Sequence, residues 1–217
     1  MRTGEVFALT WDDIDLKERK IKIYKTLYSK VKDEKGRWFL GTTKTESSVR
    51  EVYICDTLLK TLVNYKKYQN DNKKLFKSKY HKYYLEPVKN KYGKIIEFRI
   101  IEIKHKSKNR KDINLVFVGK NGIFTGTDVI RYPFKVIRGE LKIEDCRFYD
   151  LRGSFATKTL RSGVEIKDVA EILGHSRIET TENYYISSSR ESRKEATELF
   201  EKQIKSETIK NIIEFKW

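Results

Sequence analysis

The 217-residue sequence predicts a mixed α+β fold, mainly α, with a small three-stranded antiparallel sheet and a β-rich insertion. Three observations support this fold class. Residues 20–54 alternate between apolar and polar side chains around two turns, residues 73–114 contain a second alternating segment, and residues after 148 place apolar side chains at helical spacing. A chain of this length can bury a sizeable core. We therefore expect one domain at 1–189 and a helical tail at 190–217.

The first third of the chain supplies the predicted sheet. The opening residues are typical of the end of a helix, and a polar DDID turn leads into a strand around Ile21 and Ile23. Two further strand-like runs lie in GRWFLGTTKTESSVREVYI (36–54), on either side of a turn, and complete three antiparallel strands. The run DTLLKTLVNYKKYQ (56–69) predicts a helix with Asp56 as its N-cap.

The middle of the chain is predicted to be an insertion, at residues 73–114. It is rich in lysine with aromatic residues between, and GKIIEFRIIEIKH (93–105) alternates like one strand of a hairpin. Its charge is typical either of a solvated face or of phosphate contact. After it, LVFV (115–118) predicts a short strand, followed by a helix that Thr127 or Asp128 could cap and that Pro133 would kink or shorten.

The last third is predicted to be helical. One helix runs from Leu151 to Leu160, Gly163 breaks it, and a second helix ends at Gly174. The tail at 190–217 has an amphipathic pattern too sparse for a core of its own. It could pack within the chain or on another subunit.

Composition limits the function. The formal net charge of +16 favours a polyanionic partner, and nucleic acid is the first candidate. The sequence has no apolar run long enough to span a bilayer and no signal peptide, so we expect a cytoplasmic protein without a membrane partner. Cys55 and Cys146 lack neighbours at metal-ligand spacing, which argues against zinc.

The stretch LGHSRIETTENYYISSS (173–189) contains two adjacent tyrosines, Tyr184 and Tyr185, in a polar setting. A tyrosine hydroxyl that attacks a phosphodiester needs cations on the phosphate oxygens, a proton acceptor and an acid for the leaving oxygen. The candidates for these tasks are Arg2, Lys44, Arg152 and His175.

The order of the motifs in this chain resembles one known family. R-x-G-E and W-x-D-I-D are followed by TKTESSVR, DLR-x-x-x-A-T, LGHS and TT-x-x-Y. This order is similar to the catalytic domain of tyrosine recombinases, specifically phage-type and mobile-element integrases. The resemblance extends from Arg2 to about Ser189 and covers the insertion less well.

The resemblance implies a role for each matching residue. Arg2 and Arg152 would bind the scissile phosphate, with Glu5 steadying the first arginine. Lys44 would protonate the departing 5′ oxygen, and His175 would hydrogen-bond the phosphate. A tyrosine would form a 3′-phosphotyrosine intermediate, so the implied activity is site-specific cleavage and rejoining of double-stranded DNA at attachment sites by a homotetramer. The resemblance implies no metal and no cofactor.

Two features of the motifs leave alternatives. Tyr149 stands where the family usually has histidine, and Gly153 stands where another histidine is common; a phenol can position a phosphate but exchanges protons less readily near neutral pH. The commonest family spacing selects Tyr184 as the nucleophile, whereas some integrases have one residue more and would select Tyr185. A catalytically inactive DNA-binding remnant and a type IB topoisomerase are the competing interpretations.

The chain begins almost at the first site residue. The resemblance implies a helix before this point and upstream domains that bind DNA. We therefore expect a fragment that binds DNA weakly and does not recombine DNA alone.

Overall fold

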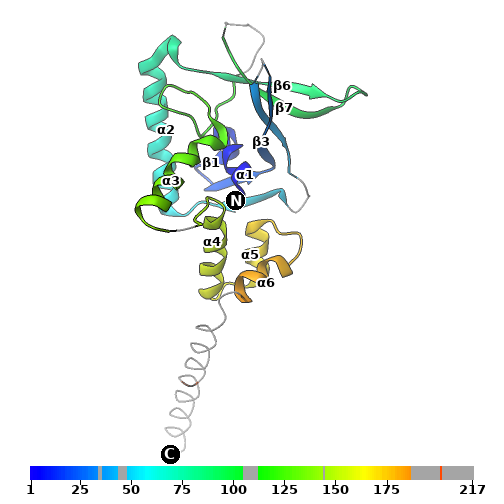
Figure 1. The fold of residues 1–217 in the computed structure, drawn as a ribbon, viewed down its shortest axis with the longest axis vertical. Helices are drawn as coiled ribbons and strands as arrows, with labels where there is room; N and C mark the ends of the chain where they lie inside the picture. Colours follow the sequence, from blue (N-terminus) through cyan, green and yellow to red (C-terminus); the bar gives the residue numbers. More distant parts are fainter. Residues whose placement is uncertain (34–35, 44–47, 105–111, 144, 187–200, 202–217) are drawn as a thin grey trace, which may run out of the picture.

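The computed structural model describes residues 1–33, 36–43, 48–104, 112–143, 145–186 and 201, and for residues 31–33, 36 and 183–186 it describes the backbone alone. Two sheets and the helices α1 to α3 form one part, and α4 to α6 form a helical part below it in Figure 1. The N-terminus lies where these parts meet (Figure 1). The predicted α+β class is confirmed.

The strands form two antiparallel sheets rather than one. The first has the order β1 (Ile14–Asp15), β2 (Lys20–Ile23), β5 (Arg50–Tyr53). The second has the order β3 (Lys25–Asp33), β4 (Gly36–Thr42), β7 (Ile95–Glu102), β6 (Tyr83–Lys89). The predicted three-stranded antiparallel sheet is therefore present, but with β1 in place of the strand expected near 36–42. That strand, β4, belongs to the second sheet because the chain changes sheets at Tyr24, between β2 and β3. The predicted hairpin of the insertion is present and extends the second sheet through β4.

Helix α1 (Thr3–Phe7) lies directly on strand β3. At Gly4 an added Cβ would lie 2.4 Å from Thr26 Oγ1 and 2.7 Å from the Leu27 carbonyl oxygen, so no side chain fits between helix and strand. Phe7 from this helix enters the core of the second sheet, which includes Leu40. The glycine of the R-x-G-E motif thus permits the close packing that fixes the first turn of α1.

Helix α2 (Asp56–Phe76) flanks the first sheet and is longer than predicted. Its N-cap is Cys55 rather than Asp56, whose carboxylate pairs instead with the guanidinium of Arg19 at 2.6 Å. The buried Gln69 accepts a hydrogen bond from Trp11 and donates to the carbonyl of Leu115. The first four residues of the predicted insertion therefore belong to this helix, which a short turn, η3 (Lys77–Lys79), follows.

The segment after the insertion differs from its prediction. Leu115 forms only an isolated bridge with Thr10, so LVFV is not a strand. A 3₁₀ turn, η4 (Gly126–Ile130), leads into α3 (Arg131–Glu140), and the predicted caps Thr127 and Asp128 lie inside that turn. Pro133 occupies the first turn of α3, where a backbone N–H has no intrahelical acceptor, and so the proline neither breaks nor shortens the helix.

Three helices form the remaining part: α4 (Asp150–Arg161), α5 (Ile166–Leu173) and α6 (Glu179–Ile186). Ala156 and Leu160 of α4 pack against Val169 and Leu173 of α5. Gly174 ends α5 in the left-handed conformation, as predicted. Apart from the helical Glu201, the predicted tail lies outside the described residues. Over the ranges that are described, no helix is long and apolar enough to cross a membrane.

Candidate active site

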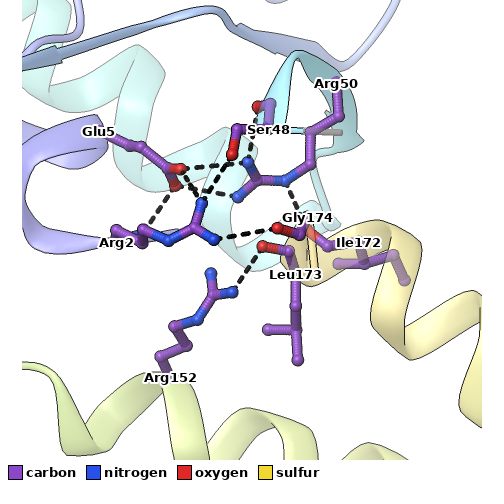
Figure 2. A network of polar contacts seen from close by, with 8 residues as sticks. All are labelled: Arg2, Glu5, Ser48, Arg50, Arg152, Ile172, Leu173 and Gly174. Carbon is purple, nitrogen blue, oxygen red and sulfur yellow. Dashed lines mark hydrogen bonds and ion pairs between the residues drawn. The ribbon is translucent and has the colours of Figure 1, made fainter. Parts of the chain in front are cut away.

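The end of α5 is the centre of the site. The last carbonyl groups of an α-helix have no intrahelical donor, and they form the negative end of the helix dipole. Three arginines donate to three successive carbonyls there: Arg50 to Ile172 at 2.8 Å, Arg152 to Leu173 at 2.6 Å, and Arg2 to Gly174 at 3.0 Å. Figure 2 shows these guanidinium groups converging from three separate elements.

Arg2 and Glu5 form the first half of the site. Arg2 precedes α1 and donates to the Glu5 carboxylate at 2.9 Å, while its backbone N–H donates to the same carboxylate at 2.7 Å. Arg50 donates to both carboxylate oxygens of Glu5, at 3.2 and 2.9 Å. Burial alone would raise the pKa of Glu5, but hydrogen bonds and charge from Arg50 and Arg2 outweigh it and lower this pKa to about 2. Glu5 is therefore a carboxylate at neutral pH.

Arg50 and Ser48 are site residues that the sequence interpretation missed. The Ser48 hydroxyl accepts a hydrogen bond from Arg2, and its carbonyl accepts one from Arg50. Arg50 alternates with Val52 on the inward side of β5, and Val52 packs on the core. An arginine on the inward face of a half-buried strand requires partners, which is the signal that could have identified it.

Arg152 lies on α4 with 4% of its surface exposed. Besides the bond to the Leu173 carbonyl, its buried Nε and Nη1 atoms have no hydrogen-bond acceptor among the described residues. Burial and then the charge of Arg2 lower the pKa of Arg152, although a guanidinium stays protonated in a protein. Two buried donors without acceptors are costly, and an anion would satisfy both.

His175 follows Gly174 and lies beside the arginines. Its Nδ1 atom is 2.8 Å from the hydroxyl of Thr181, a fully buried residue of α6. Burial, followed by the charges of Arg152, Arg2 and Arg50, lowers the pKa of His175 to about 4. The imidazole is therefore neutral near pH 7. When the Thr181 hydroxyl donates to Nδ1, the ring proton is on Nε2, which can then donate to a ligand.

The structure brings together four of the predicted residues: Arg2, Glu5, Arg152 and His175. Tyr149 is the N-cap residue of α4, is 46% exposed, and lies three positions before Arg152.

Lys44 lies outside the described residues. Tyr184 and Tyr185 lie in α6, three and four residues after Thr181, and only their backbone is described. The choice of nucleophile therefore stays a prediction.

The chemistry of these side chains is that of an anion site. Among the described residues, no group of three or more His, Cys, Asp or Glu side chains could hold a metal ion. Cys55 is exposed and Cys146 is partly buried. The site combines three guanidinium groups and a neutral imidazole with one carboxylate, that of Glu5, so it has excess positive charge for a phosphate.

A comparison of the whole sequence with models of protein families agrees with this fold and this anion site. The sequence model of the phage integrase family matches residues 1–192, and the chain belongs to that family. The resemblance to tyrosine recombinases predicted from the motifs is thereby confirmed.

Two curated relatives are bacterial recombinases. A tyrosine recombinase XerC-like protein of Caldanaerobacter subterraneus subsp. tengcongensis is 27% identical over 190 residues, which is 85% of this chain and 42% of the relative. Tyrosine recombinase XerC of Bradyrhizobium diazoefficiens is 36% identical over 70 residues, 32% of this chain and 22% of the relative. This chain thus spans less than half the length of either relative.

A solved structure has a similar fold. The Tn1549 transposon integrase, in complex with circular intermediate DNA, superposes with a TM-score of 0.57 at 20% identity, covering 92% of this chain and 56% of that one. A second structure of that integrase, with transposon right end DNA, has a TM-score of 0.56 at 19% identity, covering 92% and 54%. At these identities the likeness concerns the fold.

Proposed function

We propose that the chain is the catalytic part of a site-specific DNA recombinase that cuts and rejoins DNA through a 3′-phosphotyrosine intermediate. The observation that carries this proposal is Arg152, whose two buried donors have no acceptor among the described residues and lie beside Arg2 and His175. A phosphodiester of DNA supplies the missing acceptors. Membership of the phage integrase family supports the same reaction.

Each residue has a role in the proposed reaction. Arg2 and Arg152 bind the two non-bridging oxygens and stabilise the charge that develops on them. Neutral His175 donates a hydrogen bond from Nε2. The tyrosine hydroxyl loses its proton to water, and its oxygen forms a bond to phosphorus as the bond from phosphorus to the 5′ oxygen breaks. Lys44 gives the departing 5′ oxygen a proton. A new 5′-hydroxyl reverses the step, so the strand is rejoined without an external energy source.

The partner proposed for the chain is double-stranded DNA. The integrase structures with a similar fold were solved as DNA complexes, and the charge of +16 favours a polyanion. A homotetramer on paired attachment sites and a location in the cytoplasm remain proposals of the same kind.

Covalent trapping tests the function and the nucleophile together. Nicked duplexes drawn from the DNA that flanks the gene would be incubated with the wild-type chain, Tyr184→Phe and Tyr185→Phe, with the full-length protein beside them. We expect a protein–DNA adduct that resists detergent and is lost in Tyr184→Phe only. Loss in Tyr185→Phe alone would assign the other tyrosine. Absence of an adduct from every protein, with DNA binding intact, would favour the inactive DNA-binding remnant.

A further inference from the structure

We infer that Arg50 is a positioning residue, which holds Glu5, Arg2 and the end of α5 in the arrangement that binds phosphate but does not itself contact the phosphate. This inference rests on the proposed function. Arg50 lies beside the groups proposed to bind phosphate, but its N–H groups are used differently from theirs.

The use of donors separates the three arginines. A guanidinium has five N–H groups. Arg50 uses four of them, for the two oxygens of Glu5 and the carbonyls of Ser48 and Ile172. Arg2 makes three side-chain hydrogen bonds and Arg152 makes one. Arg152 therefore has most donors left for a ligand, and Arg50 has almost none.

Exposure separates Arg50 from Arg2 but not from Arg152, so the use of donors is the criterion that distinguishes all three. The Arg50 side chain is 7% exposed and the Arg2 side chain 40%, while Arg152 has 4% of its surface exposed. Arg50 also lies between Glu5 and the α5 carbonyls, as Figure 2 shows. A ligand that reached Arg50 would have to displace a two-oxygen contact with a carboxylate that is itself 2% exposed.

Arg50 joins three elements at one point. From β5 it contacts α1 through Glu5, the loop before its own strand through Ser48, and α5 through the carbonyl of Ile172. Glu5 in turn orients Arg2, and His175 lies three residues beyond Ile172. Without Arg50, Glu5 is a buried carboxylate held by Arg2 alone, and the end of α5 loses one of its three anchors. Both changes move phosphate-binding groups, and small misplacements of such groups slow a reaction strongly.

Single-turnover kinetics at saturating DNA provide the test. The full-length protein would carry Arg50→Met, Arg50→Lys, Glu5→Gln and the double change, with nicked duplex as substrate. We expect Arg50→Met to slow covalent complex formation by about 100-fold, as for a misplaced catalytic group, with the Kd for the duplex changed by less than about threefold. Arg50→Lys keeps the charge but not the forked contact, and we expect intermediate loss.

The double variant distinguishes positioning from direct contact. If Arg50 acts through Glu5, the double variant Glu5→Gln/Arg50→Met should form the covalent complex no more slowly than the slower single variant. Either single change already disrupts the contact between Arg50 and Glu5, so the other change has little left to remove. Losses that multiply would overturn the inference. The double variant also removes the buried carboxylate that Arg50→Met leaves without its main partner. If Arg50→Met does not fold, we therefore still expect the double variant to fold.

Controls separate this inference from the proposed function. Arg19→Met removes an arginine whose carboxylate partner, Asp56, is on the surface, and we expect wild-type rates. In the free chain, the NMR titration of His175 should move to higher pH in Arg50→Met and stay unchanged in Arg19→Met, because Arg50 is one of the three arginines whose charge lowers the pKa of this ring and Arg19 is not. Wild-type rates in both Arg50 variants would overturn the inference alone. A wild-type protein without any covalent complex would overturn the proposed function and this inference with it.

Discussion

His175 is uncharged at neutral pH because its surroundings are already cationic. Burial and the charges of Arg152, Arg2 and Arg50 all disfavour a second proton on the ring. A neutral imidazole can donate one hydrogen bond to a phosphate without adding charge to a site that already has excess positive charge. The pKa of His175 thus depends on the neighbouring arginines, and a change in their positions should change this pKa.

The first prediction concerns the pH dependence of His175. Its pKa of about 4 in the folded chain lies below the ordinary value of 6.5, so the unfolded chain binds more protons between these values, and stability falls as pH falls through that window. Between pH 7 and 5 we expect wild type to lose about 1 kcal/mol more than His175→Gln does, measured by urea unfolding, because solvent screening of the partly exposed ring reduces the full linkage effect. NMR should give a midpoint near 4 that rises when inorganic phosphate or DNA binds. A midpoint at 6.5 or higher in the free chain would contradict this account.

Among residues, those to which a motif assigned a role were predictable, whereas Arg50 ends the motif TKTESSVR without an assigned role. Arg2, Glu5, Arg152 and His175 each stand in a short motif, and the structure places them together. Arg50 is one of 47 lysines and arginines, and its role depends on a carboxylate 45 residues away and a carbonyl 122 residues away. Sequence alone gives no distance between such positions.

At the scale of elements, the short helix α5 joins the site together, because arginines from three other elements donate hydrogen bonds to its last carbonyl groups. The left-handed Gly174 stops the helix where its last carbonyls face α1, α4 and β5. At Gly174 an added Cβ would lie 2.8 Å from Nη1 of Arg50. This glycine is therefore required both by its backbone conformation and by the close approach of an arginine.

The second prediction compares two glycines that end helices. Gly174→Ala and Gly163→Ala both place a side chain at positive φ, 69° and 85°. Only Gly174→Ala also meets a neighbour, since nothing lies within 4 Å of a Cβ at Gly163. We expect each to lose about 1 kcal/mol of unfolding free energy to backbone strain. Covalent complex formation should fall at least tenfold only in Gly174→Ala, and equal rates in the two variants would contradict the contact with Arg50.

Elements with a strong local pattern were predictable, and their partners were not. The β6–β7 hairpin, α4, α5 and the glycine that ends α5 agree with the sequence pattern. Alternation indicates a strand but does not say which strand pairs with it. For that reason the single residue Tyr24, which moves the chain from one sheet to the other, could not be predicted, nor could the bridge of Leu115 to Thr10 in place of a strand.

At the scale of the whole molecule, net charge and family membership determine the expected behaviour. A charge of +16 on 217 residues favours association with any polyanion, before a specific site is found. The site has excess positive charge as well, since Arg2, Arg50 and Arg152 meet there and Glu5 is the carboxylate that pairs with two of them. The chain as a whole and the site are thus both positively charged, and both charges favour a polyanion.

The third prediction follows from that charge. Binding of the chain to a random duplex should weaken about 10³-fold between 50 and 200 mM salt, as expected for a footprint of about six phosphates. Fluorescence anisotropy with a labelled duplex measures it, and the thermal midpoint of the free chain at each salt concentration controls for unfolding. An affinity that does not respond to salt would contradict a binding mode dominated by phosphate contacts.

The meeting of Arg2, Arg50 and Arg152 at one helix end also makes the reactive centre a late product of folding. Arg2 and its carbonyl partner are 172 residues apart in sequence, Arg50 and its partner are 122 apart, and only Arg152 is within 21 residues of its own. Contacts between distant positions form after local ones. A nascent or partly unfolded chain therefore has the three arginines without the arrangement in which they meet. Under the proposed function, an immature chain would therefore lack the site that cuts DNA.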